Sequence, residues 1–377
     1  MSGIYIHVPY CKQACHYCDF HFSVKKETKA AFVDALVKEI ELQKNYLNGE
    51  KIETLYFGGG TPSLLSSDEL NRIFEKLQTH FSFTDQAEIT LEANPDDLNS
   101  EKISELKLFP INRLSLGIQS FFDKDLRWMN RAHDAAQSES SVKRAQDAGF
   151  ENITIDLIYG LPEVANEVWE ENLDRAFTLH IQHLSCYSLT VEPRTALAHF
   201  ISAGKSKPIN EEQAAQQYEI LIGKMQEQNW LHYEISNFAS NENFISKHNS
   251  AYWFGNKYLG LGPSAHSFDG NTRQWNARNN HRYINSLAGD VIPFEKEDLS
   301  QTQRINEAIM TRLRTIWGLP FSIFQNDPGP DFLKQIKQKS IPFMEESFVE
   351  MNEDSLILTE KGKMIADKII LELMIDD

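Results

Sequence analysis

Residues 4–18, IYIHVPYCKQACHYC, join a β-strand to a cysteine cluster. Ile4 to Val8 are β-branched or aromatic around one histidine, as in a buried strand, and Pro9 ends the run. The following loop carries Cys11, Cys15 and Cys18 in a C-x3-C-x2-C spacing. One short segment therefore offers three thiolates directly after a strand.

The cysteine cluster has several interpretations. Three thiolates on a cubane iron–sulfur cluster leave one iron without a protein ligand, and that iron can bind a small molecule. A zinc site is an alternative, because zinc takes four Cys or His ligands and a fourth could be His7, His16 or His21. An unligated loop is a third. A disulfide is disfavoured, because the long chain is poor in cysteine and suits a reducing compartment. We expect the distant Cys186 to be a buried core thiol.

The bulk composition is that of a soluble globular protein. The 377 residues, 41% hydrophobic and 24% charged, suffice for a large domain and a small one. A net charge of -17 argues against nucleic acid as the main partner, because phosphate binding needs a basic surface. Neither a membrane-spanning apolar run nor a signal peptide is evident, so we expect a cytoplasmic protein.

Strand-like and helix-like stretches alternate from residue 3 to about residue 190. The predicted strands are 3–8, 52–57, 87–92, 113–119, 152–159 and 183–190. Helices are predicted around residues 32–40, 66–77, 101–108, 135–148 and 168–179. Such repeats imply parallel strands with right-handed crossovers, in either an open doubly wound sheet or a complete or partial barrel.

The pattern changes after residue 200. A helix at 211–228 leads to a stretch rich in glycine and aromatic residues that ends near Phe268. Beyond residue 302, helices at 304–315 and 331–339 precede a hairpin at 348–358 and a final helix at 361–373. This order predicts a small winged-helix-like domain. The segment is not notably basic, so we expect it to pack or to contact protein.

Glycine and polar residues lie on or after the predicted strands. The run Gly58-Gly59-Gly60-Thr61 follows the second strand, and glycines permit a tight turn or a close ligand approach. The polar residues are Glu92, Gln119, Arg131 and Asp156. Each is individually just as compatible with an ordinary strand-end hydrogen bond or a surface charge. Together, at the carboxyl ends of parallel strands, they predict a site for a polar, zwitterionic ligand.

These features resemble the radical S-adenosylmethionine (SAM) enzymes, in the branch of the oxygen-independent coproporphyrinogen III oxidase. The resembling motifs span nearly the whole chain: 5–9 with the cysteines, 56–62, 92–95, 116–121, 130–131, 156–162 and 233–238. We therefore predict an α/β fold, with a partial (β/α)6 TIM-like barrel and a smaller C-terminal domain. The expected divisions are a radical SAM barrel at 1–200, a barrel extension at 201–300 and the winged-helix-like domain at 301–377.

The resemblance also implies the cofactors and their ligands. A [4Fe–4S] cluster would be held by Cys11, Cys15 and Cys18, and SAM would close the fourth iron through its amino and carboxylate groups. Tyr5 would lie beside the cluster. The implied SAM contacts are Gly59, Gly60, Thr61, Glu92, Gln119, Arg131 and Asp156. Guanidinium–carboxylate pairing, and carboxylates accepting from amino or hydroxyl groups, suit such a ligand.

The sequence departs from the oxidase in two places. The oxidase has a further cysteine two residues after the third, where this chain has Phe20, and a longer extension before its cluster. Both departures put coproporphyrinogen decarboxylation in doubt. They match instead the related HemW group of heme chaperones.

Residues 248–253, HNSAYW, resemble the HNxxYW motif of that group. Histidine can ligate heme iron and aromatic rings can pack on a porphyrin, so His248 is a candidate ligand and His266 a second one. On its own, a histidine beside aromatics is more often a hydrogen-bonded core residue.

The leading hypothesis is a heme chaperone that binds a [4Fe–4S] cluster, SAM and heme and delivers heme to hemoproteins. The alternatives are the oxidase itself and a radical SAM enzyme with another substrate. The resemblance allows a homodimer, and the chain could associate peripherally with a membrane through a partner.

Overall fold

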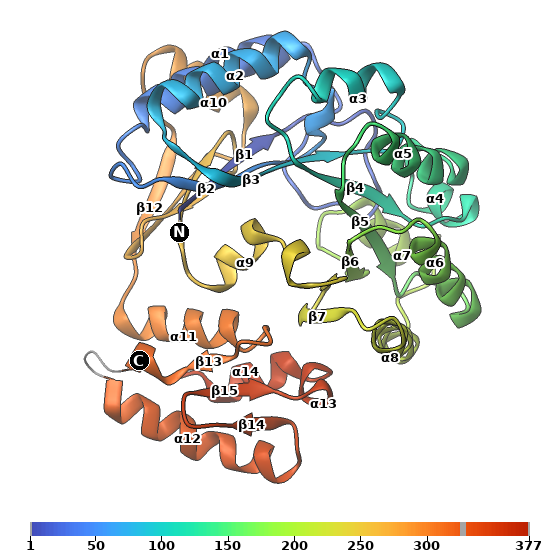
Figure 1. Ribbon diagram of the computed structural model, residues 1–377, viewed down its shortest axis with the longest axis vertical. Helices are drawn as coiled ribbons and strands as arrows, with labels where there is room; N and C mark the ends of the chain where they lie inside the picture. The colour runs from blue at the N-terminus through green and yellow to red at the C-terminus, as the bar shows by residue number, and fades with distance from the viewer. Residues whose placement is uncertain (1, 325–328, 376–377) are drawn as a thin grey trace.

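The computed structural model describes residues 2–324 and 329–375. A curved sheet dominates it, with helices on its outer, convex side (Figure 1). The strand order is β12-β11-β10-β9-β1-β2-β3-β4-β5-β6-β8-β7. The sheet does not close, so the predicted α/β fold with a partial barrel is confirmed.

The six predicted strands are confirmed as the parallel centre of this sheet. Several ends differ from the prediction, most of all in the third strand, which starts earlier. The strands are β1 (Ser2–Val8), β2 (Ile52–Gly59), β3 (Phe83–Ala93), β4 (Arg113–Gln119), β5 (Asn152–Tyr159) and β6 (His183–Ser188).

Outer helices follow these strands and bury one face each against the sheet. The predicted ones are α1 (Lys29–Leu42), α2 (Ser67–His80), α3 (Ser100–Leu106), α5 (Ala135–Asp147) and α6 (Asn166–Thr178). Helix α2 begins at a capping box in which Ser66 and Glu69 bond each other's backbone amides. Four helices were not predicted: α4 (Asp123–Trp128), α7 (Ala196–Ser202), α9 (Lys247–Trp253) and α10 (Asn280–Ala288). They are short, and a turn or two of helix carries little periodicity.

The expectation that the parallel pattern fades after β6 is wrong in one respect. Strand β9 (Lys257–Leu261) pairs parallel with the free edge of β1, so a seventh parallel strand comes from the middle of the chain. Gly260 lies within this strand and Gly262 directly follows it. A Cβ at Gly260 would collide with the His266 carbonyl, so glycine lets β10 (His266–Phe268) fold back closely.

Antiparallel strands extend both edges of the sheet. Strands β10, β11 (Thr272–Asn276) and β12 (Phe294–Asp298) continue beyond β9, and β8 (Asn237–Ala239) and β7 (Leu231–Glu234) continue beyond β6. Helices α8 (Glu211–Glu227) and α10 (Asn280–Ala288) complete the outer layer. The short helix α9 (Lys247–Trp253) lies inside the open curve of the sheet (Figure 1).

The C-terminal region has its own core, centred on buried residues such as Ile309, Leu356 and Ile369. Its elements are α11 (Gln301–Arg312), β13 (Leu319–Pro320), α12 (Gly329–Glu345), β14 (Val349–Met351), β15 (Ser355–Leu358), α13 (Glu360–Lys363) and α14 (Ala366–Leu373). The predicted hairpin is confirmed as β14–β15. The prediction of a single closing helix at 361–373 is wrong, because this segment forms two helices, α13 and α14. No helix among the described residues is both long and apolar enough to span a membrane.

Candidate functional site

A cavity of about 670 Å³ opens at the carboxyl ends of the central strands. Side chains and glycines from several different strand ends reach it, as the strand-end pattern predicts. The predicted site residues that line it are Cys11, Cys15, Cys18, Gly59, Gly60, Thr61, Glu92, Gln119, Arg131 and Asp156. Phe20 lines it too, with 71% of its surface exposed.

The cysteine loop is held by the residues around it. Its stem is closed where the Cys11 amide donates to the Ser23 carbonyl at 3.0 Å. Gln13 donates to the Asn130 side-chain oxygen at 2.8 Å, and Asn130 donates back to the Ala14 carbonyl at 2.7 Å. The loop is therefore braced against the turn that precedes Arg131.

The histidines considered as a fourth zinc ligand have other contacts. His7 Nε2 bonds the His21 carbonyl at 2.8 Å, His16 Nδ1 bonds the Trp128 carbonyl at 2.8 Å, and His21 Nε2 bonds Asn280 at 2.6 Å. Residues 2–324 and 329–375 contain no group of three or more His, Cys, Asp or Glu side chains placed to hold a single metal ion.

The thiols lie in a partly desolvated setting. Burial raises the pKa of Cys11 and of Cys18 to about 11, so metal coordination must displace their protons. Arg131 Nη1 donates to the Cys15 sulfur at 3.2 Å, which places a positive charge beside the remaining thiol of the three, that of Cys15. Three thiols opening on one cavity, with a guanidinium beside them, match the donor set of a three-cysteine cluster.

The glycine loop packs directly against the stem of the cysteine loop. Gly59 has a φ of 101°, and a Cβ there would lie 2.5 Å from the His7 ring. A Cβ at Gly60 would lie 2.7 Å from the carbonyl oxygens of Val8 and Tyr10. No other residue fits at these two positions without displacing the strand end, which leaves bare backbone facing the cavity.

Two buried carboxyl groups give the cavity its electrostatic character. Burial raises the pKa of Glu92 and of Asp156 to about 7. Glu92 accepts from the Tyr56 hydroxyl at 2.7 Å and the Gly59 amide at 3.2 Å. Among the described residues neither acid has an ion-pair partner within 4.0 Å, so a cationic ligand would stabilise both carboxylates.

Arg131 and Gln119 also line the cavity. Arg131 Nη2 donates to Asn94 Oδ1 at 2.5 Å and to the Gly117 carbonyl at 2.8 Å, whereas its buried Nε has no partner within the described part of the chain. Gln119 adopts a left-handed φ of 65°. A non-glycine residue pays strain for that conformation, and such strain concentrates at binding sites.

Two predicted site residues, Tyr5 and His248, do not line this cavity. Tyr5 lies one layer behind it, with its hydroxyl 3.1 Å from His7 Nδ1 and its ring stacked near Tyr56. His248 is only 3% exposed. Its Nδ1 is 2.8 Å from Thr54 Oγ1 and its Nε2 is 3.0 Å from the Tyr252 hydroxyl, and burial lowers its pKa to about 3.

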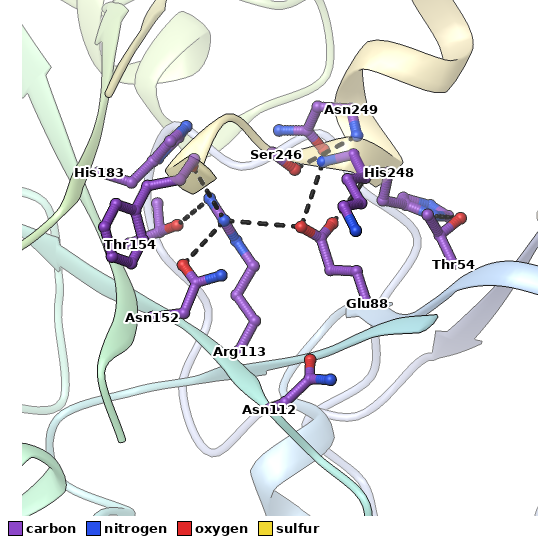
Figure 2. Close-up of polar contacts among 12 residues, drawn as sticks. Thr54, Glu88, Asn112, Arg113, Asn152, Thr154, His183, Ser246, His248 and Asn249 are labelled. Carbon is purple, nitrogen blue, oxygen red and sulfur yellow. Dashed lines mark hydrogen bonds and ion pairs between the residues drawn. The ribbon is translucent and has the colours of Figure 1, made fainter. Parts of the chain in front are cut away.

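A buried ion pair anchors the start of α9 (Figure 2). Glu88 of β3 accepts from the backbone amides of Lys247 at 3.1 Å and His248 at 2.9 Å. Arg113 of β4 lies 3.6 Å from Glu88 and also donates to the Phe244 carbonyl at 3.1 Å. A carboxylate at a helix N-terminus with a buried cation behind it fixes α9 inside the sheet.

Sequence reasoning missed part of the cavity lining. The missed residues include Tyr17, Asn94, Arg113, Ser246 and Asn249. A charged Arg113 at the start of an apolar strand was an available signal. Ser246 could not be found from local patterns, because it reaches the cavity through the long-range docking of α9. Asn249 belongs to the 248–253 motif, but its place at this cavity follows from the same docking.

The remaining candidates lie elsewhere. His266 is exposed on β10, with its ring stacked on Trp275, and does not line the cavity. Cys186 is 1% exposed within β6, as predicted for a core thiol.

A second cavity of about 390 Å³ lies beside the first and shares Tyr187 and Asn249 with it. Tyr252 and Trp253 of α9, Glu234 of β7 and Arg314 also line it. The motif at 248–253 is therefore divided, because His248 faces the core whereas Tyr252 and Trp253 reach this cavity.

Comparison with known proteins agrees with this geometry. Residues 5–176 match the model of the radical SAM superfamily, and residues 299–365 match that of the HemN C-terminal domain. Coproporphyrinogen III oxidase (HemN) from Escherichia coli, 23% identical, has the same fold, with a TM-score of 0.85 over 99% of this chain and 90% of that chain. These matches define a radical SAM protein with a HemN-type C-terminal domain.

Relatives that align with nearly the whole chain identify the family within the radical SAM superfamily. The heme chaperone HemW of Bacillus subtilis (strain 168) is 33% identical over 98% of both chains. HemW of Lactococcus lactis subsp. lactis (strain IL1403) is 32% identical over 100% of this chain and 98% of its own. The chain belongs to the HemW family of the radical SAM superfamily, and that superfamily implies a [4Fe–4S] cluster and SAM.

Proposed function

We propose that this protein is a heme chaperone that holds a [4Fe–4S] cluster and SAM in the first cavity and binds heme for delivery to hemoproteins. The observation that carries the proposal is the similarity to curated heme chaperones over 98% of both chains. The four cysteines are free thiols, which suits a reducing compartment, and we propose the cytoplasm.

The first cavity is the proposed cofactor site. Cys11, Cys15 and Cys18 would hold the cluster, which when reduced supplies an electron to SAM. Backbone at Gly59, Gly60 and Thr61 would line the methionyl end. Glu92 and Asp156 would offset positive charge and accept hydrogen bonds, while Arg131 and Gln119 would orient the polar groups. Tyr5 supports this wall from behind through Tyr56.

The heme contact is proposed at α9. His248 has both ring nitrogens hydrogen-bonded, so ligation of iron by this residue would require α9 to shift. Tyr252 and Trp253 need no such movement to reach a ligand, because they already line the second cavity. Aromatic side chains supply the flat apolar surface that a porphyrin needs.

A titration with hemin tests the proposal. The anaerobically reconstituted protein should give a saturable Soret shift, and the loaded protein should pass its heme to an apo-hemoprotein such as apomyoglobin. Absence of a saturable shift would contradict the chaperone function.

The second candidate function is the oxidase, which the shared fold favours. Phe20 opposes it, because a phenyl group can neither ligate metal nor transfer a proton where the oxidase has a cysteine. Robust anaerobic conversion of coproporphyrinogen III to protoporphyrinogen IX would overturn this preference for the chaperone.

A further inference from the structure

The end of α9 and the α11–β13 turn form one surface beside the second cavity. The Trp317 ring packs on Phe254 at a centroid distance of 4.8 Å and lies 6.2 Å from the Tyr233 ring. The Ile316 amide donates to the Tyr233 carbonyl at 3.0 Å, which ties the turn to β7. We call the surface made by Trp253, Phe254, Arg312, Arg314 and Trp317 the arginine–tryptophan groove.

Large apolar side chains are exposed here although the fold has cores nearby. In the α11–β13 turn, Ile316 is 38% exposed and Trp317 is 37% exposed. Trp253 adds an indole that lines the second cavity. Clustered exposed apolar groups cost free energy unless a ligand covers them, and flat aromatic groups favour a flat ligand.

Two guanidinium groups flank these aromatic rings. Arg312 is half-buried, lies 4.7 Å from the Phe254 ring centre and donates to the Phe254 carbonyl at 2.9 Å. Within the described residues it has no ion-pair partner, and burial lowers its pKa. Arg314 lines the second cavity and is paired at 2.7 Å with Asp367, whose side chain is 85% exposed.

These cations are notable because the chain as a whole is acidic, with a net charge of -17. A guanidinium without a carboxylate partner, fixed against an aromatic ring, is preorganised to bind a carboxylate. The Arg314–Asp367 pair is solvent-accessible and is therefore easily exchanged for a ligand carboxylate.

We propose that the arginine–tryptophan groove binds the heme macrocycle, with Trp253 and Trp317 packing on the porphyrin and Arg312 and Arg314 receiving its two propionates. This inference rests on the proposed chaperone function and adds the location and the charged contacts of the ligand. It uses the exposed part of the 248–253 motif and leaves His248 in the core.

The first cavity is a poorer place for the same ligand. Its buried acids Glu92 and Asp156 would repel propionates, and its cysteine loop is proposed to be filled by the cluster and SAM. The groove brings Arg312 and Arg314 next to an aromatic wall, and the acids near it are Glu234, which lines the second cavity, and the exposed Asp367. Heme and SAM therefore occupy neighbouring sites, joined through Tyr187 and Asn249.

A comparison of hemin with hemin dimethyl ester tests this assignment, because the ester keeps the macrocycle and removes both carboxylates. The wild-type protein should bind hemin at least about tenfold more tightly than the ester, because each of the two propionates makes a charge-assisted contact and one such contact is worth about tenfold. Arg312→Gln and Arg314→Gln should each reduce that preference, and the double variant should abolish it. Arg304→Gln is the matched control, because Arg304 lies on the same helix and contacts Asn271 instead.

The outcomes separate the two proposals. Equal affinity for hemin and its ester in the wild type overturns the groove assignment without any variant. Binding of hemin that is unchanged in the double variant also overturns it. Failure of the wild type to bind either compound contradicts the proposed chaperone function itself. Quenching of tryptophan fluorescence by hemin should be clearly weaker in Trp317→Phe, and unchanged quenching counts against the proposed position of the porphyrin.

Discussion

The first cavity and the α9 region are adjacent but are built on different principles. The cavity collects polar groups from successive strand ends, and each already faces the space that a ligand would fill. In the α9 region, neighbouring residues of one motif point to different environments. His248 is enclosed by Thr54, Tyr56 and Tyr252, whereas Trp253 borders the second cavity.

The first cavity is formed by the order of the strands in the sheet, whereas the α9 region is formed by the way a helix packs against the sheet. Parallel strands bring their carboxyl ends together whatever the details of packing, so the cavity follows from the fold. The position of α9 depends instead on one buried ion pair, Glu88–Arg113, and its hydrogen bonds. The following predictions test whether the two regions behave independently.

The largest expected effect is loss of the cluster. Cys15→Ala should lower the iron content of the reconstituted protein from about four per chain to near zero, because two thiolates cannot retain the cubane. Iron and sulfide analysis measures this. Cys186→Ala is the matched control, since that thiol is buried in β6 away from the cavity, and equal loss in the control would contradict the assignment.

Breaking the anchor of α9 should cost stability. Arg113→Met leaves Glu88 buried without its cation and should lower the free energy of unfolding by about 3–5 kcal/mol. Arg72→Gln breaks an exposed pair with Asp34 and should cost no more than about 1 kcal/mol. Urea denaturation of both variants gives the comparison. Similar small losses would show that α9 does not depend on the buried pair.

His248→Ala should separate stability from cofactor binding. The variant loses the hydrogen bonds to Thr54 and Tyr252 and a ring stacked 4.8 Å from Tyr56, at a cost of about 2–4 kcal/mol. Because His248 does not line the first cavity, SAM affinity of the folded variant should change less than about twofold. A much larger change in SAM affinity would mean that the two regions are coupled.

The smallest effect concerns pH. Burial raises the pKa of Glu39, Glu92, Asp156 and Glu234 to about 7 in the folded protein. A carboxyl group whose pKa is raised in the folded protein adds stability below its unfolded pKa, which is 4.5 for Glu and 3.8 for Asp, and that stability is lost as the pH rises through 7. Buried histidines with lowered pKa values change the pH dependence of stability only below about pH 6.5, where the unfolded chain begins to protonate them. The ligand-free protein should therefore become less stable between pH 6.5 and pH 8.

Glu39→Gln isolates one of these groups. Glu39 accepts bonds from Tyr283, Asn276 and the Gly262 amide, and none of these residues lines the first cavity. The variant should be less stable overall, but the loss between pH 6.5 and pH 8 should shrink by roughly 1 kcal/mol. Thermal unfolding at several pH values measures it. Bound SAM should weaken the pH dependence that arises from Glu92 and Asp156 but not that from Glu39. An unchanged pH dependence in the variant would count against this explanation.

Much of this arrangement was predictable from sequence. The alternation of strands and helices, the strand-end residues and the cysteine spacing are local patterns, and they led to the parallel core and to the cysteine, glycine and strand-end residues of the first cavity. Strand β9 was missed because its pairing with β1 joins segments about 250 residues apart. The inward direction of His248 was also hidden, since sequence spacing does not say which way a docked helix turns its side chains.

The central claim is that SAM and heme occupy separate sites on one chain. The direct test is equilibrium binding of SAM to the anaerobic, cluster-loaded protein, measured with and without saturating hemin. The account predicts that both ligands bind together and that the dissociation constant of SAM stays within about twofold. Competitive displacement of SAM by hemin would contradict it.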